Sequence, residues 1–243
     1  MNLMRRGDFL VIAHRGYSDG HIENTREAFE AAILAGADLI ETDVRLSGDG
    51  TLYCNHDPDL ERVRGTDRSI AELPDGTLDQ LNVLRLTDVL EIARGRVGVL
   101  LDLKLAYRDY PVLVHDAVDL LDMQGSVVFG VRSVNQAQTL YNHAPDAAIL
   151  GFLQSRNDFP AFFAAGGSIA RLWEAEADEQ TVAAARDGNH PVWITAGLRQ
   201  EGIAAGDIDA VRLRRLVDLE IDGVLVNEPA RALVLRNAGA VAL

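Results

Sequence analysis

The sequence contains very little cysteine, which limits the kinds of site it can form. Cys54 is the only cysteine among 243 residues, so the chain can form no internal disulfide bond and no cysteine-rich zinc site. Long hydrophobic runs are also missing. The apolar run near the start covers only residues 9–13, too short for a signal peptide, and no stretch approaches the length of a membrane span. We therefore expect a cytoplasmic protein without stable membrane association.

Positively charged residues are scarce compared with acidic ones. The sequence has 23 Lys and Arg against 37 Asp and Glu, which gives a formal net charge of −14 at pH 7. Because a nucleic-acid-binding surface has to be basic, this balance argues against nucleic acid as a partner. An acidic protein can still bind an anionic substrate, provided that the site itself holds a local group of cations or a metal ion.

Hydrophobic residues make up 48% of the chain, enough for a sizeable core. Short runs rich in Val, Ile and Leu alternate with longer stretches of helical pattern. Continuous apolar strands separated by helices are typical of a parallel sheet covered on both faces. About eight such units in a chain of this length predict a single (β/α)₈ TIM barrel over residues 1–243. A doubly wound open sheet is the competing architecture.

The segment after the first predicted strand carries clear helix signals. Asn24 stands where an N-cap is expected, with Glu27 three residues later as in a capping box. Gly36 follows the last apolar residues of the pattern and is predicted to end the helix. Further along, the Gly48–Gly50 segment predicts a tight turn between two extended segments. These signals place a helix over residues 24–36.

In a parallel barrel, catalytic groups lie where strands end and the loops to the next helices begin. The first predicted strand ends in His14 and Arg15, side by side. His56 lies just past the turn after the second strand and could return an imidazole to the same end of the barrel. Two histidines can serve as general acid and general base, because imidazole titrates near neutral pH.

Three carboxylates stand at the ends of neighbouring predicted strands. Glu41 and Asp43 are two residues apart on one strand, so both side chains can face the barrel interior. Asp102, near the end of the next barrel strand, could complete the set. Carboxylates this close repel each other unless a proton or a cation lies between them. We therefore predict a site for a divalent metal with oxygen ligands, Mg²⁺ or Ca²⁺.

Two cations accompany these carboxylates. Arg15 follows His14, and Lys104 lies two residues after Asp102. Both could offset the charge of a phosphate, while a metal could act as Lewis acid on a phosphoryl oxygen. Each pair taken alone could be an ordinary ion pair or a strand end reaching water. Their coincidence at consecutive strand ends indicates the hydrolysis of a phosphodiester.

The order of these motifs resembles the glycerophosphodiester phosphodiesterase family. The text "AHRG" is followed by "ENTREAFEAAILAGADLIETDVRLSGDGTLYCNHDPDLERVRG", with the family's His-Arg-Gly, Glu-Asn-Thr, Glu-x-Asp-Val and His-Asp motifs at similar spacing. The resemblance is weaker in "LLDLK", "VWIT" and "EIDGVLVNEP". It implies a (β/α)₈ barrel, a divalent metal, and hydrolysis of a small-molecule glycerophosphodiester to glycerol 3-phosphate and an alcohol.

The resemblance also implies roles for single residues. His14 and His56 correspond to the acid–base pair, Arg15 to a phosphate contact, and Lys104 to the family's lysine beside the phosphate or metal. The implied metal ligands are the three carboxylates: Glu41, Asp43 and Asp102. Which histidine is the acid, and whether water or the substrate's own hydroxyl attacks phosphorus, stays open at this point.

A few positions depart from the family pattern. Asp102 replaces a glutamate, Ile22 replaces a proline, and Asn227 replaces an aspartate near the last strand, a position interpreted as structural. The segment between His56 and Asp102 is shorter than in many members, where a small insertion helps to select the substrate. The alcohol half of the substrate is therefore left open.

Further expectations concern single residues outside the motif. Trp193 ends a predicted strand on the active-site side and could wall the substrate pocket or pack in the core. Glu174, after another strand, could contact a substrate hydroxyl, and Asn24 could hold active-site side chains. His115 and His143 are interpreted as surface residues.

Two other functions compete with glycerophosphodiester hydrolysis. A lipid-directed phosphodiesterase of the sphingomyelinase-D type would share the metal site but act at a membrane. A barrel that binds a phosphorylated ligand without turnover would usually lack a histidine or a metal carboxylate, whereas here each of these positions is filled. The sequence predicts no particular oligomeric state.

Overall fold

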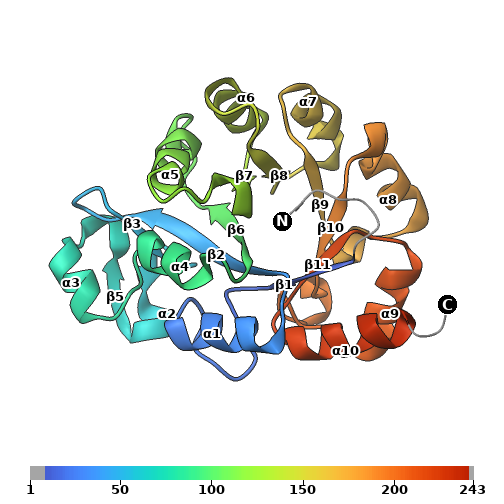
Figure 1. Ribbon diagram of the computed structural model, residues 1–243, viewed down its shortest axis with the longest axis horizontal. Coiled ribbons are helices and arrows are strands. Elements are labelled where there is room, and N and C mark those ends of the chain that lie inside the picture. Colours follow the sequence, from blue (N-terminus) through green and yellow to red (C-terminus); the bar gives the residue numbers. More distant parts are fainter. Residues whose placement is uncertain (1–8, 241–243) are drawn as a thin grey trace.

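Eight parallel strands close into a barrel in the computed structural model, which describes residues 9–240 (Figure 1). In chain order the barrel strands are β1 (Leu10–Ala13), β2 (Leu39–Leu46), β6 (Gly98–Leu103), β7 (Val127–Val131), β8 (Ala148–Gly151), β9 (Ile169–Trp173), β10 (Val192–Thr195) and β11 (Gly223–Val226). Strand β1 pairs with both β2 and β11 and so closes the ring. The predicted (β/α)₈ barrel is confirmed, and the competing open sheet is excluded by this closure. Residues 1–8, part of the stretch compared above with a signal peptide, lie outside the described residues.

Helices surround the barrel (Figure 1). The longer ones are α1 (Arg26–Ala35), α4 (Leu86–Ala93), α5 (Tyr110–Asp119), α6 (Val134–His143), α7 (Phe159–Ala164), α8 (Glu179–Ala185), α9 (Ala210–Asp218) and α10 (Pro229–Ala240). Short 3₁₀ helices are η1 (Ile70–Glu72), η2 (Gln124–Ser126), η3 (Arg156–Asp158), η4 (Glu174–Glu176), η5 (Asp187–Asn189) and η6 (Arg199–Glu201). Phe29 of α1, Val89 of α4 and Val114 of α5 are fully buried against the outer face of the strands. Gly36 ends α1 in the left-handed conformation, as predicted.

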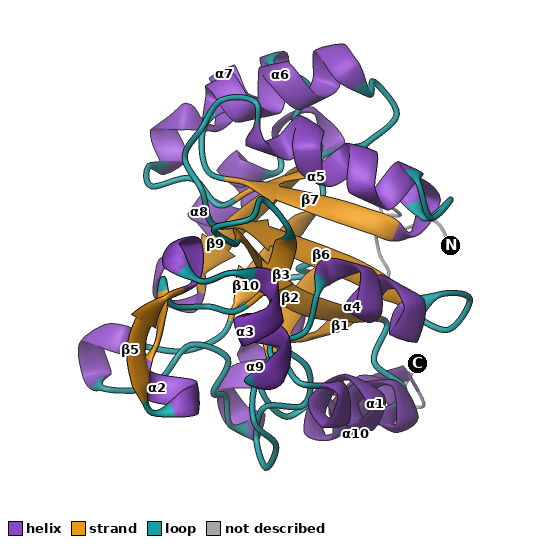
Figure 2. Ribbon diagram, turned by 90° about the vertical axis from the view of Figure 1, so that its left-hand side faces the viewer, coloured by secondary structure: helices purple, strands orange, loops and turns teal. Residues whose placement is uncertain are grey.

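An extension is inserted between β2 and β6. It contains β3 (Leu52–Cys54), antiparallel to β2, the hairpin of β4 (Asp59–Leu60) and β5 (Thr66–Ser69), and helices α2 (Glu61–Arg64) and α3 (Asp75–Gln80). In Figure 2, β5 and α2 project to the left of the barrel. The predicted tight turn joins β2 to β3, with Gly50 at φ 87°. A small apolar cluster that includes Tyr53, Leu60 and Leu78 packs the extension.

The barrel interior is layered by the two-residue period of its strands. A buried apolar layer includes one residue from each of several strands: Ile12, Leu39, Leu100 and Trp193. Two residues further along the same strands are polar side chains: His14, Glu41, Asp102 and Thr195. Because alternate side chains point to the same face, this polar layer lies above the apolar one, at the carboxyl ends of the strands. The fold therefore gathers polar groups at one mouth of the barrel.

The start of α1 differs from the prediction by one residue. The N-cap is Thr25, whose hydroxyl oxygen accepts a hydrogen bond from the Ala28 N–H at 3.3 Å. The amide of Asn24 instead donates to Asp43 Oδ2 at 2.9 Å and accepts from the Thr42 hydroxyl at 2.7 Å. The predicted N-cap is wrong because these buried hydrogen bonds to β2 occupy the Asn24 side chain. They agree with the expectation that Asn24 holds a side chain of the site.

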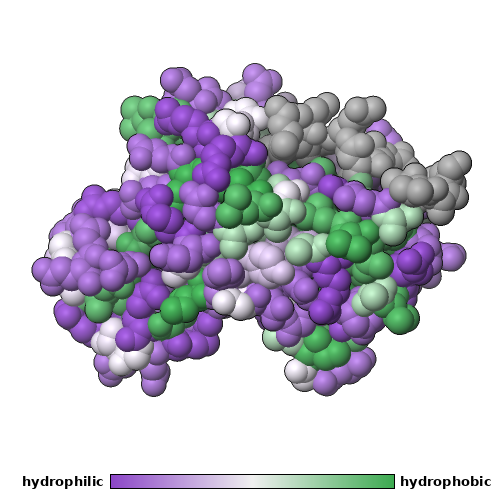
Figure 3. Space-filling view, turned by 60° about the horizontal axis from the view of Figure 1, so that its bottom comes forward, coloured by the Kyte–Doolittle hydropathy of each residue, from purple (hydrophilic) through white to green (hydrophobic). Residues whose placement is uncertain are grey.

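The outer surface is mixed in character. Hydrophilic residues cover most of the face in Figure 3, hydrophobic residues form smaller groups between them, and the lower edge is indented between two lobes. Among the helices of residues 9–240, none combines the length and the apolar character needed to cross a bilayer.

Candidate active site

A cavity of about 300 Å³ opens at the carboxyl ends of the barrel strands. Seven of the eight residues predicted for the site line it: His14, Arg15, Glu41, Asp43, His56, Asp102 and Lys104. They lie on β2 and β6, directly after β1 and β6, and in the loop after β3. The structure thus brings together the groups that the sequence placed at separate strand ends.

Trp193 is the exception, and here the structure corrects the expectation of a pocket wall. Its side chain is fully buried in the apolar layer beneath the polar one, and it does not line the cavity. Phe152, just after β8, Phe159, the first residue of α7, and Trp173, the last residue of β9, line the cavity instead.

Glu174 is also absent from the cavity lining. Its carboxylate is buried, lies 2.6 Å from a terminal nitrogen of Arg212, and accepts the backbone N–H of Gly197 at 2.7 Å. These bonds satisfy the carboxylate within the protein. Glu174 therefore ties two loops together and has no free oxygen directed at a substrate hydroxyl.

The three predicted metal carboxylates form one buried group. Glu41, Asp43 and Asp102 are at most 6% exposed, and their ligand atoms lie within 4.8 Å of one another. Burial, together with the two neighbouring carboxylates, raises the pKa of Glu41 well above its ordinary value. Such a group is short of positive charge and offers only oxygen donors, so it fits a divalent metal of the Mg²⁺ or Ca²⁺ type.

Cations contact the other two carboxylates, Asp43 and Asp102. Lys104 Nζ lies 2.7 Å from Asp43 Oδ1 and 2.5 Å from Asp102 Oδ2, and an Arg132 nitrogen lies 2.6 Å from Asp102 Oδ1. Burial alone would raise the pKa of Asp43, but Lys104 and Arg15 outweigh it and hold this pKa well below the usual range. Asp43 is therefore anionic in the metal-free site, where Glu41 readily takes a proton.

The loop that carries Arg15 is tied to two neighbouring elements. The Arg15 backbone has φ 56°, and its N–H donates to Glu41 Oε2 at 2.8 Å. The guanidinium lies 3.0 Å from Glu23 Oε1 and 3.4 Å from Asp43 Oδ2. Arg62 of α2 also binds Glu23, at 2.7 Å. Arg15 is thereby fixed between β2 and the extension, at the rim of the cavity.

Gly16 completes the His-Arg-Gly motif for a steric reason. It has φ +81°, and a Cβ at this position would lie 2.7 Å from the backbone carbon of Ala28 in α1. Only glycine allows the loop to rest directly on the helix. This close approach fixes the loop that carries His14 and Arg15.

His14 is buried and oriented by Asn227. Its Nδ1 lies 2.7 Å from Asn227 Oδ1, while the Asn227 Nδ2 donates to Ala205 O at 2.9 Å and to Asp207 Oδ1 at 2.7 Å. Because both acceptors face Nδ2, the amide oxygen must face His14. Nδ1 then carries the ring proton and Nε2 is left as the acceptor. Burial, and after it Arg15, lowers the pKa of His14 to about 4, so the ring is neutral at pH 7.

The contact with His14 gives Asn227, whose position the sequence favoured as structural rather than catalytic, a place beside a predicted catalytic residue. Gly206, at φ +88°, brings the neighbouring loop so close that a Cβ there would lie 2.0 Å from Asn227 Oδ1. The sequence signal was the polar residue at the carboxyl end of the last strand, a position that faces the mouth of the barrel. Sequence reasoning noted that position but did not pair it with His14.

His56 is oriented by a carboxylate. Its Nδ1 lies 2.8 Å from Asp57 Oδ1, and Asp57 Oδ2 lies 2.6 Å from Arg62 Nε. Arg45 donates to the backbone oxygen of His56, at 2.5 Å for its nearest nitrogen. Burial lowers the pKa of His56, while the Asp43 and Asp57 carboxylates act in the opposite direction. His14 faces a neutral amide, whereas His56 faces an anion, so the two rings differ in the partner of Nδ1.

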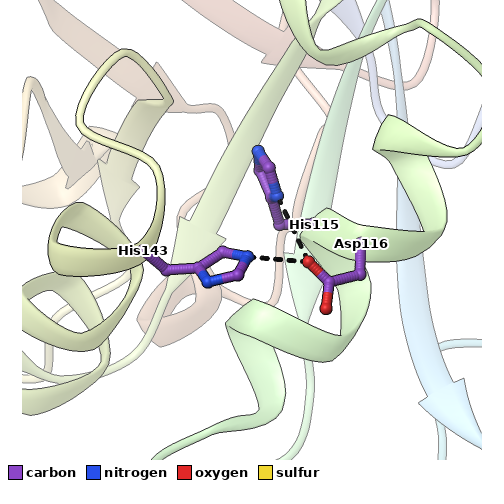
Figure 4. Close-up of side chains that lie close together, drawn as sticks. All are labelled: His115, Asp116 and His143. Carbon is purple, nitrogen blue, oxygen red and sulfur yellow. Dashed lines mark hydrogen bonds and ion pairs between the residues drawn. The ribbon is translucent and has the colours of Figure 1, made fainter.

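A second group of possible metal ligands lies outside the cavity, between α5 and α6 (Figure 4). His143 Nε2 is 2.7 Å from Asp116 Oδ1, and His115 Nδ1 is 3.7 Å from the same oxygen. The His143 side chain is 39% exposed, but that of His115 is only 12% exposed, because it packs near Phe129. None of these three residues lines the cavity, so the group is separate from the candidate active site.

Comparisons with known proteins point to one family. The model of the "Glycerophosphoryl diester phosphodiesterase family" matches residues 14–128. A Bacillus subtilis protein, provisionally named a glycerophosphodiester phosphodiesterase, is 31% identical over 181 residues, which cover 63% of this chain and 71% of that protein. A crystal structure of glycerophosphodiester phosphodiesterase from Agrobacterium tumefaciens has a TM-score of 0.77 at 26% identity, covering 92% of this chain and 99% of that one.

The fold is also shared with a more distant solved structure. An Oleispira antarctica phosphodiesterase in complex with the product sn-glycerol-3-phosphate has a TM-score of 0.79 at 20% identity. The match covers 94% of this chain and 96% of that one. The barrel is thus common to this chain and the two solved structures over nearly the whole of the chain.

Proposed function

This chain belongs to the glycerophosphoryl diester phosphodiesterase family, and we propose that its cavity hydrolyses glycerophosphodiesters to glycerol 3-phosphate and an alcohol. As a member of that family the chain is a phosphoric diester hydrolase. The observation that carries the proposal is the convergence of two histidines, three carboxylates and two cations on one cavity at the barrel mouth. The distant relative that holds sn-glycerol-3-phosphate supports glycerol 3-phosphate as the product.

The divalent metal would be held by Glu41, Asp43 and Asp102, the buried oxygen donors of the site. A hard cation such as Mg²⁺ or Ca²⁺ suits them, because all three donors are carboxylates. When bound, the metal would polarise a phosphoryl oxygen as a Lewis acid. Arg15 at the rim would bind a phosphate oxygen, and Lys104 would add positive charge beside it.

The hydrogen bonds of the two histidines support different roles. His14 is neutral at pH 7 and keeps its proton on Nδ1 through Asn227, so its Nε2 would remove a proton from the attacking hydroxyl group. Burial lowers the pKa of His56, but the Asp57 carboxylate at its Nδ1 acts in the opposite direction and would stabilise the imidazolium when the ring holds a proton. His56 would therefore protonate the leaving alcohol. The attacking group would be water or the glycerol hydroxyl of the substrate itself.

A substrate panel tests the proposed function. Glycerophosphocholine, glycerophosphoethanolamine, glycerophosphoinositol and lysophosphatidylcholine would be assayed with and without EDTA. We expect release of glycerol 3-phosphate from at least one glycerophosphodiester, stopped by EDTA and restored by Mg²⁺ or Ca²⁺. Turnover of the lysolipid alone would favour a lipid-directed phosphodiesterase. No turnover of any substrate would contradict the proposal and favour a binding protein.

Replacement of Asn227 tests the orientation of His14. Asn227→Ala removes the acceptor at Nδ1, and we expect kcat to fall about 10- to 100-fold with little change in KM, because the ring loses its tautomer and position. Asn227→Asp keeps an acceptor but adds a charge that favours the imidazolium. The pKa of His14 should then rise, so that activity on the acid side is lost at a higher pH than in the wild type.

A matched double variant separates this effect from simple repulsion. In the wild type, Asp207 Oδ1 lies 2.7 Å from Asn227 Nδ2. Asn227→Asp would place a carboxylate against Asp207, so Asp207→Asn should be added to relieve the repulsion. The pH profile of kcat/KM is the readout for each variant. An unchanged kcat and pH profile in Asn227→Ala would show that Asn227 has no positioning role.

A further inference from the structure

The cavity wall opposite the metal carboxylates is rich in arginine. Strand β9 lies four strands from β2 in either direction around the barrel, so its residues face β2 across the mouth. Three arginines on this side line the cavity, and we refer to them as the arginine wall: Arg171 on β9, Arg156 in η3 after β8, and Arg199 in η6 after β10. Among the described residues, no carboxylate oxygen lies within 4.0 Å of a side-chain nitrogen of these three. The wall therefore carries positive charge that no ion pair offsets.

Arg171 is the most enclosed member of the arginine wall. It lies within the apolar strand β9 and is only 6% exposed, and its Nε donates to the Thr195 hydroxyl at 2.8 Å. In the described part of the chain its two terminal nitrogens make no hydrogen bond. Burial lowers the pKa of Arg171 to about 9, which still leaves the guanidinium charged at neutral pH. A buried charge without an anionic partner is unfavourable, and an anion entering the cavity would relieve it.

Trp173 holds two members of the wall in place. The guanidinium carbon of Arg171 lies 3.5 Å from the centroid of the Trp173 ring, and that of Arg199 lies 4.3 Å from it. Phe152 adds a further contact with Arg171 at 5.2 Å. Stacking on an aromatic ring orients a guanidinium but does not neutralise its charge. The two charges are thus pre-positioned at the cavity and remain available to a ligand.

The cations near the metal carboxylates, on the side of the cavity that we call the hydrolytic half, are paired with carboxylates. Arg15, Lys104 and Arg132 each lie within 3.4 Å of Asp43 or Asp102. On the arginine-wall side, the carboxylate that lines the cavity is Glu176, and it accepts the backbone N–H of Trp173 at 3.0 Å. In a chain of net charge −14, an excess of positive charge confined to this wall indicates an anionic ligand.

We propose that the arginine wall is a subsite for a second anionic group, a phosphate or carboxylate, on the alcohol half of the substrate. This rests on the proposed function, because the phosphodiester would occupy the hydrolytic half while the alcohol extends across the mouth towards β9. The forked guanidiniums of Arg171 and Arg199 suit the paired oxygens of either anion. Glycerophosphodiesters of anionic alcohols are then the preferred substrates, and those of cationic alcohols such as choline are disfavoured.

Two pairs of substrates test the subsite and separate the two anions. Glycerophosphoinositol is compared with glycerophosphoinositol 4-phosphate, and glycerophosphoethanolamine with glycerophosphoserine, which adds a carboxylate. The ratio of kcat/KM within each pair is the readout. We expect a ratio of about 10 or more in favour of the more anionic member in at least one pair, expressed mainly in KM.

Variants of the arginine wall locate the effect. Arg171→Gln and Arg199→Gln are each expected to lower the ratio several-fold. Arg199 is exposed, so its variant is expected to fold even if the variant of the buried Arg171 does not. Arg94→Gln, an exposed arginine at the end of α4 and outside the cavity, is the matched control and should leave the ratio unchanged.

A binding measurement keeps the subsite distinguishable from the proposed function. Intrinsic tryptophan fluorescence would be followed during titration with inositol 4-phosphate and with inositol, neither of which contains a phosphodiester. Of the two tryptophans, Trp173 lines the cavity and Trp193 does not. Saturable binding of the phosphate alone, weakened in Arg199→Gln, supports the subsite even if none of the four diesters is cleaved, a result that contradicts only the proposed function. Cleavage with ratios near one, and no binding of inositol 4-phosphate, overturns the subsite and leaves the proposed function standing.

Discussion

Replacing His14 by alanine is expected to lower kcat/KM by about three orders of magnitude while the barrel still folds. Two histidines line the cavity among the described residues, His14 and His56. Asn227 fixes the tautomer of His14, so that its Nε2 lone pair can accept a proton. Without it, no positioned group would accept the proton of the attacking hydroxyl. The structural loss is small, because the side-chain hydrogen bond to Asn227 disappears while the backbone hydrogen bonds of residue 14 remain.

The measurement is steady-state release of glycerol 3-phosphate, with circular dichroism and thermal unfolding to verify the fold. His21→Ala is a matched control, since His21 lies in the same loop, is exposed, and does not line the cavity. Added imidazole should restore part of the activity of His14→Ala by entering the vacated space. A His14→Ala protein that keeps near wild-type kcat/KM would remove His14 from the mechanism.

Replacing Glu41 by glutamine is expected to change activity and metal-free stability in opposite directions. Glutamine has the same shape and can still accept the Arg15 N–H, but it removes one charge from the buried carboxylates. Loss of a metal ligand should weaken metal binding about 100-fold and lower activity at limiting metal to a similar extent. Without metal, relief of the repulsion should raise the free energy of unfolding by about 1–2 kcal/mol at pH 7.

The stability difference should depend on pH with a defined sign. The folded-state pKa of Glu41 is raised above its ordinary value of 4.5. Below pH 4.5 both folded and unfolded states are protonated, so wild type and Glu41→Gln should differ little. Above pH 4.5 the unfolded chain releases the proton more readily than the folded one, and the metal-free wild type loses stability as pH rises. Glu41→Gln lacks this loss.

Thermal unfolding in EDTA at pH 4 and pH 7, and again with Mg²⁺ or Ca²⁺ at pH 7, measures both effects. The wild type should gain more from the metal than Glu41→Gln does, whereas Glu41→Gln should be the more stable protein in EDTA. Glu27→Gln, a change at an exposed glutamate of α1, is the control for loss of a charge. An equal response to metal in both proteins would remove Glu41 from the ligand set.

The site could be predicted where it depends on strand periodicity. Glu41 and Asp43 are two residues apart on β2, and Lys104 directly follows β6, two residues after Asp102. The alternation of side chains in extended backbone sends each pair to the same face. Parallel strands then bring their carboxyl ends to one mouth. For this reason seven of the eight predicted residues line one cavity.

The prediction was wrong where a residue's depth or hydrogen-bond partner mattered. The Trp193 side chain points into the barrel, as predicted, but belongs to the apolar layer below the cavity, because it lies two residues before Thr195 on β10. Asn24 looked like a helix cap, yet its amide is bonded to Thr42 and Asp43 on β2. Both errors arise because a single strand or helix signal does not report what the neighbouring elements offer.

The sequence by itself determined the barrel and the place of the carboxylates and histidines at its mouth. These follow from periods of two and 3.6 residues, which can be read within each short segment of the chain. Only the tertiary structure decided that Asn227 orients His14 across 213 positions of sequence, and that Arg171 and Arg199 share the ring of Trp173 opposite Glu41. Such pairings depend on which strands become neighbours when the barrel closes. No local pattern encodes that closure, because it is fixed by the packing of the whole chain.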